Sequence, residues 1–151
     1  MKGDNTMISK VIKGHSIKKL GVVEGEAVVS PDLVAFWGGT DWESGEIVEV
    51  GHKARGKNIA GKILVCPAGK GGAGDTFGYF YLFKSGKAPR AIICNRGQGT
   101  TLAGALLTNT PMVYGFDGDV VEFVEDGDLL NVDSDTGIVK ITKSRGSASN
   151  E

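Results

Sequence analysis

Residues 62–85 read KILVCPAGKGGAGDTFGYFYLFKS, an apolar run followed by a glycine-rich loop and a segment with helical spacing. The run at 62–66 predicts a buried strand. Asp75 is of the type that caps helix N-termini, so a helix is expected from there to about Ser85, with Gly86 as its stop. Phe77, Phe80 and Tyr81 share helical spacing and are expected to pack in the core.

The elements after this stretch repeat its order. Residues 91–94 predict a strand, 100–108 a helix and 112–114 a third strand. Strands that alternate with helices pair in parallel through right-handed crossovers.

Both ends of the chain have the pattern of strands instead. Alternating or apolar runs separated by turn residues predict short strands at 22–29, 33–37, 46–50, 120–124, 129–132 and 137–141. The sequence therefore predicts a β-rich α/β domain with an α/β unit in its middle.

Length and charge limit the function classes. A chain of 151 residues with 40% hydrophobic residues has the size of one domain, and its net charge of -1 gives no reason to expect nucleic acid or an anionic membrane. The apolar runs are too short to span a bilayer, and the first residues lack an apolar signal core. We expect a cytoplasmic protein whose opening residues and polar tail, from Lys143, are loose.

Two cysteines, Cys66 and Cys94, each end an apolar run and are expected to be buried, inert thiols. Together with His15 and His52 they are too widely spread to predict a metal site. No metal or cofactor is expected on this chain.

The glycine-rich loop, residues 69–76, follows a predicted strand and opens a predicted helix, a position suited to an anion. The spacing of Gly69, Gly71 and Gly74 also fits a dinucleotide-binding turn, in which Arg96 could face a 2′-phosphate. A nucleotide-hydrolysing phosphate loop is excluded, because Asp75 stands where that motif needs lysine. The remaining reading is a sharp turn that binds nothing, although so many glycines favour close approach to a ligand.

Motifs along most of the chain, from about Gly21 to Ile141, resemble the small subunit of the aconitase X family. The resemblance rests on the order and spacing of Gly25-Glu26-Ala27, Val28-Val29-Ser30, Phe36-Trp37-Gly38-Gly39, Gly45-Glu46-Ile47, Gly51-His52, Ile59, Gly61-Lys62-Ile63-Leu64-Val65, Pro67, Gly86, Ala88-Pro89, Ala91-Ile92-Ile93 and Pro111.

The resemblance implies an aconitase-type swivelling β/β/α domain over residues 21–142. An extension at 1–20 that could hold a first strand precedes it, and a polar tail at 143–151 follows. It also implies a heterodimer with a large subunit that holds an iron–sulfur cluster through its own cysteines. Known members are hydro-lyases that dehydrate hydroxylated acids, mevalonate 5-phosphate in archaea and cis-3-hydroxyproline in bacteria. The small subunit lends its glycine-rich loop to the shared active site, so this chain alone is expected to be inactive.

The loop departs from the family pattern of proline, serine, glycine, arginine, glycine, serine, serine. Gly72 falls on the serine proposed as proton acceptor, Ala68 and Ala73 replace the other serines, and Lys70 replaces the arginine. The catalytic residue of this chain is therefore unknown. We expect an anionic hydroxy-acid substrate to bind the loop, at Gly69, Lys70, Gly71, Gly72, Ala73 and Gly74.

Two alternatives stay open, a non-catalytic anion-binding or regulatory module on the same fold and a binder of NAD(P). A weaker resemblance to the phosphohistidine swivelling domain implies a shared fold only, since Leu102 occupies the place of its histidine. Aromatic and glycine residues near turns predict the contact with the large subunit, at Phe36, Trp37, Gly38, Gly39 and Trp42. The alternative for Trp37 is a place in the core.

Overall fold

The fold is known here from a computed structural model that describes residues 7–144, so most of the ends expected to be loose, at 1–6 and 145–151, lie outside the described residues. The tail expected to be loose from Lys143 is held at its first two residues, because the Nζ of Lys143 donates to the Oδ2 of Asp128 at 2.9 Å and the N–H of Ser144 donates to the Oδ1 of the same carboxylate at 3.1 Å. The strands are β1 (Lys10–Lys13), β2 (His15–Ser16), β3 (Val22–Val29), β4 (Ile63–Cys66), β5 (Ala91–Cys94), β6 (Met112–Tyr114), β7 (Leu129–Asp133) and β8 (Ile138–Thr142). The helices are α2 (Asp75–Lys84), α3 (Gly99–Thr108) and α4 (Val120–Phe123).

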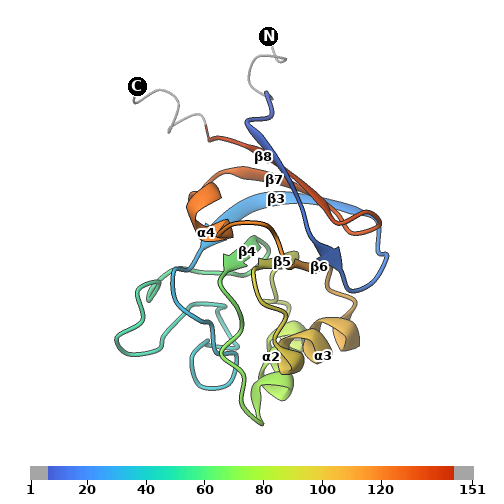
Figure 1. The fold of residues 1–151 in the computed structure, drawn as a ribbon. Coiled ribbons are helices and arrows are strands. Elements are labelled where there is room, and N and C mark those ends of the chain that lie inside the picture. Colours follow the sequence, from blue (N-terminus) through green and yellow to red (C-terminus); the bar gives the residue numbers. More distant parts are fainter. Residues whose placement is uncertain (1–6, 145–151) are drawn as a thin grey trace.

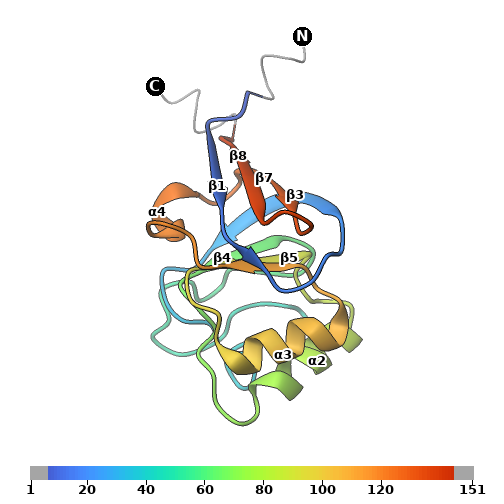
Figure 2. The ribbon, with the colours of Figure 1, turned by 45° about the vertical axis from the view of Figure 1, so that its right-hand side comes forward.

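Three layers make up the domain (Figure 1). The strands follow the order β1-β8-β7-β3-β4-β5-β6-β2. β4, β5 and β6 pair in parallel, as the order of elements predicts, and β3 joins them to the antiparallel strands β7, β8 and β1. Figure 2 shows α2 and α3 side by side beneath β4 and β5, with the antiparallel strands above. The β-rich α/β fold with a β/β/α arrangement is confirmed.

Two apolar cores separate these layers. Ile63 and Val65 of β4 face the core beneath the antiparallel strands, whereas Leu64 and Cys66 face the core above α2 and α3. Every residue of β4 is buried because both faces of the parallel strands are covered. This position explains why β4 reads as a continuous apolar run.

The strand expected at 120–124 is wrong, because these residues form α4. The carboxylate of Asp119 accepts a hydrogen bond from the backbone N–H of Val121 and caps the helix. Val120 and Val124 then lie one turn apart in the same core. A short β-branched run has the composition of a strand, and the local cap and burial outweigh that preference.

The strands expected at 33–37 and 46–50 are also wrong. Val34 makes one isolated parallel bridge with Gly69, and Ile47 and Glu46 make one antiparallel bridge each, with Thr40 and Asn58. Only single bridges form because both segments belong to a long connection that winds beside α2 between β3 and β4 (Figure 1). Across residues 7–144, no helix is long and apolar enough to cross a membrane.

Candidate functional site

The glycine-rich loop lies at the carboxyl end of β4 and leads into α2. Its first half is held against residues 33–36. The backbone N–H of Lys70 donates to the carbonyl of Val34 at 2.8 Å, and the N–H of Val34 donates to the carbonyl of Ala68 at 3.2 Å. The side of the loop that carries Lys70 is therefore fixed by backbone hydrogen bonds.

Three glycines of the loop make room for this chain's own side chains. A Cβ at Gly69 would overlap the Oγ1 of Thr101, and one at Gly71 would lie 2.6 Å from the Nε2 of Gln98. A Cβ at Gly74 would lie 3.0 Å from the Trp37 ring. The close approach that the glycine content predicts is thus made by the protein itself at these positions.

Gly72, at the family's serine position, differs from the other three. A Cβ there would meet no atom of the described chain within 4 Å, but φ is +107°, a conformation that residues with side chains rarely adopt. Position 72 therefore has room for a side chain, but its backbone conformation is one that favours glycine.

Asp75 does not cap α2, contrary to the expectation. Gly74 occupies the N-cap position, and Asp75 begins the helix. The Oδ1 of Asp75 accepts hydrogen bonds from the backbone N–H groups of Phe36, at 2.8 Å, and Trp37, at 3.2 Å. Sequence could not reveal this role, because the groups that Asp75 binds lie 38 and 39 residues away.

Burial raises the pKa of the Asp75 carboxyl, and the N–H groups of Phe36, Trp37 and Gly71 only partly oppose that rise. Its Oδ2 is buried and has no hydrogen-bond partner within residues 7–144. Asp75 therefore ties the start of α2 to the 36–37 turn at an electrostatic cost.

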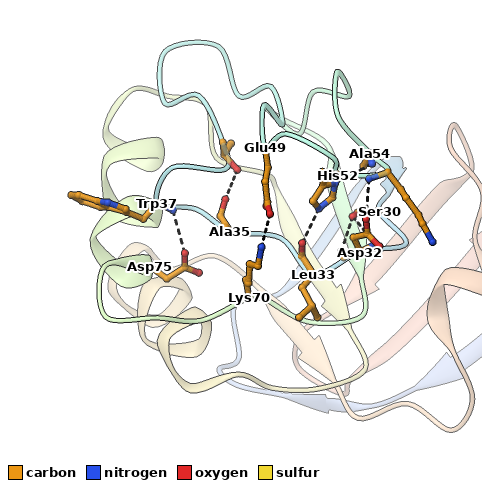
Figure 3. A network of polar contacts seen from close by, with 12 residues as sticks. Ser30, Asp32, Leu33, Ala35, Trp37, Glu49, His52, Ala54, Lys70 and Asp75 are labelled. Carbon is orange, nitrogen blue, oxygen red and sulfur yellow. Dashed lines mark hydrogen bonds and ion pairs between the residues drawn. The ribbon is translucent and has the colours of Figure 1, made fainter.

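Lys70 forms an ion pair with the Oε2 of Glu49, which projects from the long connection opposite the loop (Figure 3). Both side chains line a hollow of about 260 Å³. The other lining residues are Asp32, Leu33, Val50, Gly51 and His52. Of the predicted substrate-binding residues, Lys70 alone is among those that line this hollow.

His52 is held by the backbone on both sides of its ring. Its Nε2–H donates to the carbonyl of Leu33 at 2.7 Å, since a carbonyl only accepts, and its Nδ1 accepts from the N–H of Ala54 at 3.0 Å. The imidazole thus fixes the turn that follows Glu49 against the segment beside the loop (Figure 3).

The start of α3 is occupied by its own cap. The Oε1 of Gln98 accepts from the backbone N–H of Thr100 at 2.9 Å and from that of Thr101 at 3.2 Å. α2 and α3 also lie on one face of the parallel strands, whereas a dinucleotide-binding fold places helices on both faces. Neither feature favours the NAD(P) alternative.

The predicted interface residues separate into two groups. Phe36 is fully buried and packs edge-on against Tyr79, so it cannot contact a partner at the surface. Gly39 is buried too, and a Cβ there would lie only 2.8 Å from the carbonyl oxygen of Ala35. Gly38 is exposed, and its φ of +85° makes the turn.

Trp37 is 53% exposed, which excludes a place in the core. Its ring lies 5.3 Å from that of half-buried Trp42, which lies 4.9 Å from that of Tyr81 on α2. These three residues form an aromatic strip beside the glycine-rich loop. Phe77 is 61% and Tyr81 45% exposed, so the expectation that the aromatic face of α2 is core is wrong. The buried apolar side chains of α2 are Tyr79 and Leu82. The apolar residues of α2 do not share one face, so helical spacing alone could not identify the buried side.

The two cysteines face each other in register across β4 and β5 and are buried, as expected. Burial raises the pKa of both thiols, that of Cys94 to about 12, although Arg96 lowers it somewhat. Within the described range no three His, Cys, Asp or Glu side chains converge as metal ligands. These thiols do not suit an iron–sulfur cluster, which needs accessible thiolates.

Glu49 is the site residue that sequence reasoning missed. Its only sequence signal is a carboxylate in an alternating run, which is typical of a solvated strand face. The long connection that brings Glu49 to Lys70 is irregular, so no periodic sequence pattern predicts where this side chain lies.

Comparison with known proteins identifies the family. Residues 11–141 match the family described as Aconitase X swivel domain. The small subunit of phosphomevalonate dehydratase from Methanocella arvoryzae is 37% identical over 131 residues, 87% of this chain and 98% of that protein. The subunit of the same name from Thermococcus kodakarensis is 39% identical over 130 residues, 86% of this chain and 95% of that protein. The crystal structure of Thermococcus kodakaraensis aconitase X (holo-form) superposes with a TM-score of 0.81 at 38% identity, covering 88% of this chain and 98% of that one.

The chain therefore belongs to the aconitase X swivel domain family, as the motifs predict. Its relatives are small subunits of a dehydratase, so the expectation of a hydro-lyase subunit is confirmed.

Proposed function

We propose that this chain is the small subunit of a hydro-lyase that dehydrates mevalonate 5-phosphate. The observation that carries the proposal is the similarity to phosphomevalonate dehydratase small subunits, which extends over 98% of the Methanocella arvoryzae protein. The reaction removes a proton and a hydroxyl group from neighbouring carbon atoms and leaves an unsaturated acid phosphate.

In this proposal, the glycine-rich loop binds an anionic group of the substrate through Lys70. Two backbone hydrogen bonds to Val34 fix the loop, so Lys70 projects from a rigid base beside the hollow. A lysine ammonium is a point charge that suits phosphate or carboxylate, although it lacks the two-pronged geometry of arginine. Gly72 and Ala73 are exposed and lie just before the start of α2, where the helix dipole favours negative charge.

The reaction centre is shared with a larger partner subunit in a heterodimer. That subunit holds the iron–sulfur cluster, which assists the departure of the hydroxyl group when bound. The buried thiols of Cys66 and Cys94 support assigning the cluster to the partner. We place the partner contact at the aromatic strip of Trp37, Trp42 and Tyr81, where exposed rings lie next to the loop.

One observation favours a second candidate, a non-catalytic anion-binding or regulatory module. Gly72 lacks the hydroxyl of the family's serine, and its φ of +107° shows a loop shaped for glycine. Such a module binds the anion and leaves the substrate unchanged.

The test is co-expression with a large aconitase X-type subunit and assay of the complex on mevalonate 5-phosphate, with cis-3-hydroxyproline as the comparison substrate. We expect turnover of mevalonate 5-phosphate by the complex and none by either subunit alone. A complex that assembles with its cluster and turns over neither substrate, yet binds mevalonate 5-phosphate, would favour the regulatory module.

A further inference from the structure

Gly72 leaves the proposed dehydration without its usual proton acceptor, so another basic group within reach of the loop must accept the proton. The groups near it are the carboxylates of Asp32, Glu49 and Asp75 and the imidazole of His52. Their hydrogen bonds and ion pairs distinguish the four groups.

Asp75 and His52 are committed to backbone groups. The Oδ1 of Asp75 accepts two hydrogen bonds from the 36–37 turn, and the side chain is almost fully buried. Protonating the Nδ1 of His52 would break its hydrogen bond from the N–H of Ala54. The Oδ2 of Asp32 accepts from the N–H of Lys53 at 2.9 Å, so it too is committed to a backbone group.

Glu49 differs because its contact in the hollow is with the loop's own cation. The Oε2 of Glu49 pairs with the ammonium of Lys70, whose side chain is 49% exposed. The Oε1 of Glu49 is buried, without a hydrogen-bond partner anywhere in residues 7–144. A Cβ at Gly39 would lie 3.1 Å from this Oε1, so the second glycine of the Phe-Trp-Gly-Gly motif leaves space for the carboxylate.

We propose that the Lys70–Glu49 ion pair exchanges partners on substrate binding, and that the freed Glu49 carboxylate accepts the proton in place of the missing serine. The inference rests on the proposed function, since it assigns a residue to that reaction. Lys70 is where the anionic group binds, and Glu49 lines the same hollow.

Charge makes the exchange favourable. A half-exposed lysine–carboxylate pair contributes little net stability, so a substrate group with two negative charges displaces a single carboxylate from Lys70. Glu49 then loses the ammonium that occupies its Oε2, so this oxygen is free to accept a proton from the substrate. The base becomes active only when substrate is present.

The Oε2 of Glu49 takes a proton from carbon, the electron pair of that C–H bond forms the new C=C bond, and the hydroxyl leaves the neighbouring carbon on the partner's side. The proton on Glu49 and the departing hydroxide together make the one water released.

The first arm of the test measures anion binding by the full chain alone, with inorganic phosphate as the probe and the backbone amide signal of Lys70 as the readout. Glu49→Gln removes the competing charge, so phosphate affinity is expected to rise about two- to fivefold, the range that a weak, partly exposed ion pair allows. Glu46→Gln, an exposed residue of the same connection, is the matched control and leaves the affinity unchanged. Affinity that stays equal or falls in Glu49→Gln would overturn the partner exchange.

The second arm uses the assembled complex and mevalonate 5-phosphate. Loss of a general base typically lowers rates 10²- to 10⁴-fold, so Glu49→Gln is expected to lower kcat by about 100-fold or more without raising KM. Glu49→Asp keeps a carboxylate and restores part of kcat. A residue that only positions Lys70 would instead raise KM and spare kcat in Glu49→Gln, which would refute the proton-acceptor role. A wild-type complex inactive on this substrate refutes the proposed function and that role together, while the phosphate titration still decides the exchange.

Discussion

Asp75 accepts a hydrogen bond of 2.8 Å from the backbone N–H of Phe36, and with a second one from Trp37 this contact ties the first residue of α2 to the connection between β3 and β4. The glycine-rich loop ends at this junction, so its shape depends on a buried carboxylate rather than on a helix cap.

Replacing Asp75 separates its hydrogen bonds from its charge. Asp75→Ala leaves the buried N–H of Phe36 and the part-buried N–H of Trp37 without their acceptor and is expected to cost about 1–3 kcal/mol of unfolding free energy. Asp75→Asn keeps an acceptor oxygen and is expected to cost less. The two variants are compared by urea denaturation at pH 7, and equal losses would mean that the carboxylate oxygen is not what holds the turn.

The same residue predicts a pH dependence. Because burial raises the pKa of Asp75 above its ordinary 3.8, the folded state binds this proton more tightly than the unfolded state does. Its contribution to stability is full below pH 3.8 and is lost as pH rises through the folded pKa. The unfolding free energy of the wild type relative to Asp75→Asn should therefore fall over that window, and a flat difference would contradict the raised pKa.

Substitutions at Gly69 and Thr101 test why the loop is rich in glycine. Gly69→Ala places a Cβ on the Oγ1 of Thr101 and is expected to destabilise the fold by about 1–3 kcal/mol. Thr101→Ala removes that oxygen, so the double variant should recover much of the loss. Additive effects of the two substitutions would show that this contact does not determine the choice of glycine.

Gly72→Ser tests whether the family's serine can return. The position has open space, but a side chain at φ +107° is expected to cost roughly 1–2 kcal/mol of stability. If the account is right, the serine variant folds with reduced stability, and the dehydratase rate of the complex rises only if the loop relaxes toward the family's geometry. No loss of stability would mean that the backbone at 72 is not constrained to glycine.

Trp37 is expected to matter for assembly and Phe36 for folding. Trp37→Ala should leave the unfolding free energy within about 0.5 kcal/mol, and it should weaken binding to the large subunit by about 2 kcal/mol, as interface aromatics often do. Phe36→Ala should cost about 3–5 kcal/mol of stability, because its ring is fully buried. Leu107→Ala, an exposed apolar residue of α3, is the control for assembly. Unchanged assembly in both Trp37→Ala and Trp42→Ala would remove the aromatic strip from the interface.

The isolated chain is expected to stay colourless after anaerobic reconstitution with iron and sulfide. Burial raises the pKa of both thiols, so Cys66 and Cys94 should resist alkylation at pH 8 until the chain is unfolded. A brown, stoichiometric cluster on the chain alone would show that these thiols are accessible.

The central strands and helices could be predicted from sequence because their signals are local. The apolar run of β4, the glycine after α2 and Pro111 before β6 each mark an element within a few residues. The prediction failed at α4, where Asp119 and two buried valines outweigh a strand-like composition. It also missed Glu49, since only the path of an irregular connection brings that carboxylate to Lys70.

The same limit applies to the loop. The position of the loop and of its lysine could be predicted from the sequence, but the reason for each glycine could not. Thr101, Gln98 and Trp37 account for three of them, and all three residues lie more than 25 residues away from the glycine they contact.

The most direct test of the account is the steady-state kinetics of the assembled complex on mevalonate 5-phosphate with Lys70→Ala. Losing the loop's cation leaves Glu49 unpaired beside the substrate's anionic group, so KM is expected to rise about 10- to 100-fold, the equivalent of a charged hydrogen bond of roughly 1.5–3 kcal/mol. Gly72→Val should also impair turnover by obstructing the open face of the loop. Unchanged KM and kcat in both variants would contradict the account and remove the glycine-rich loop from the active site.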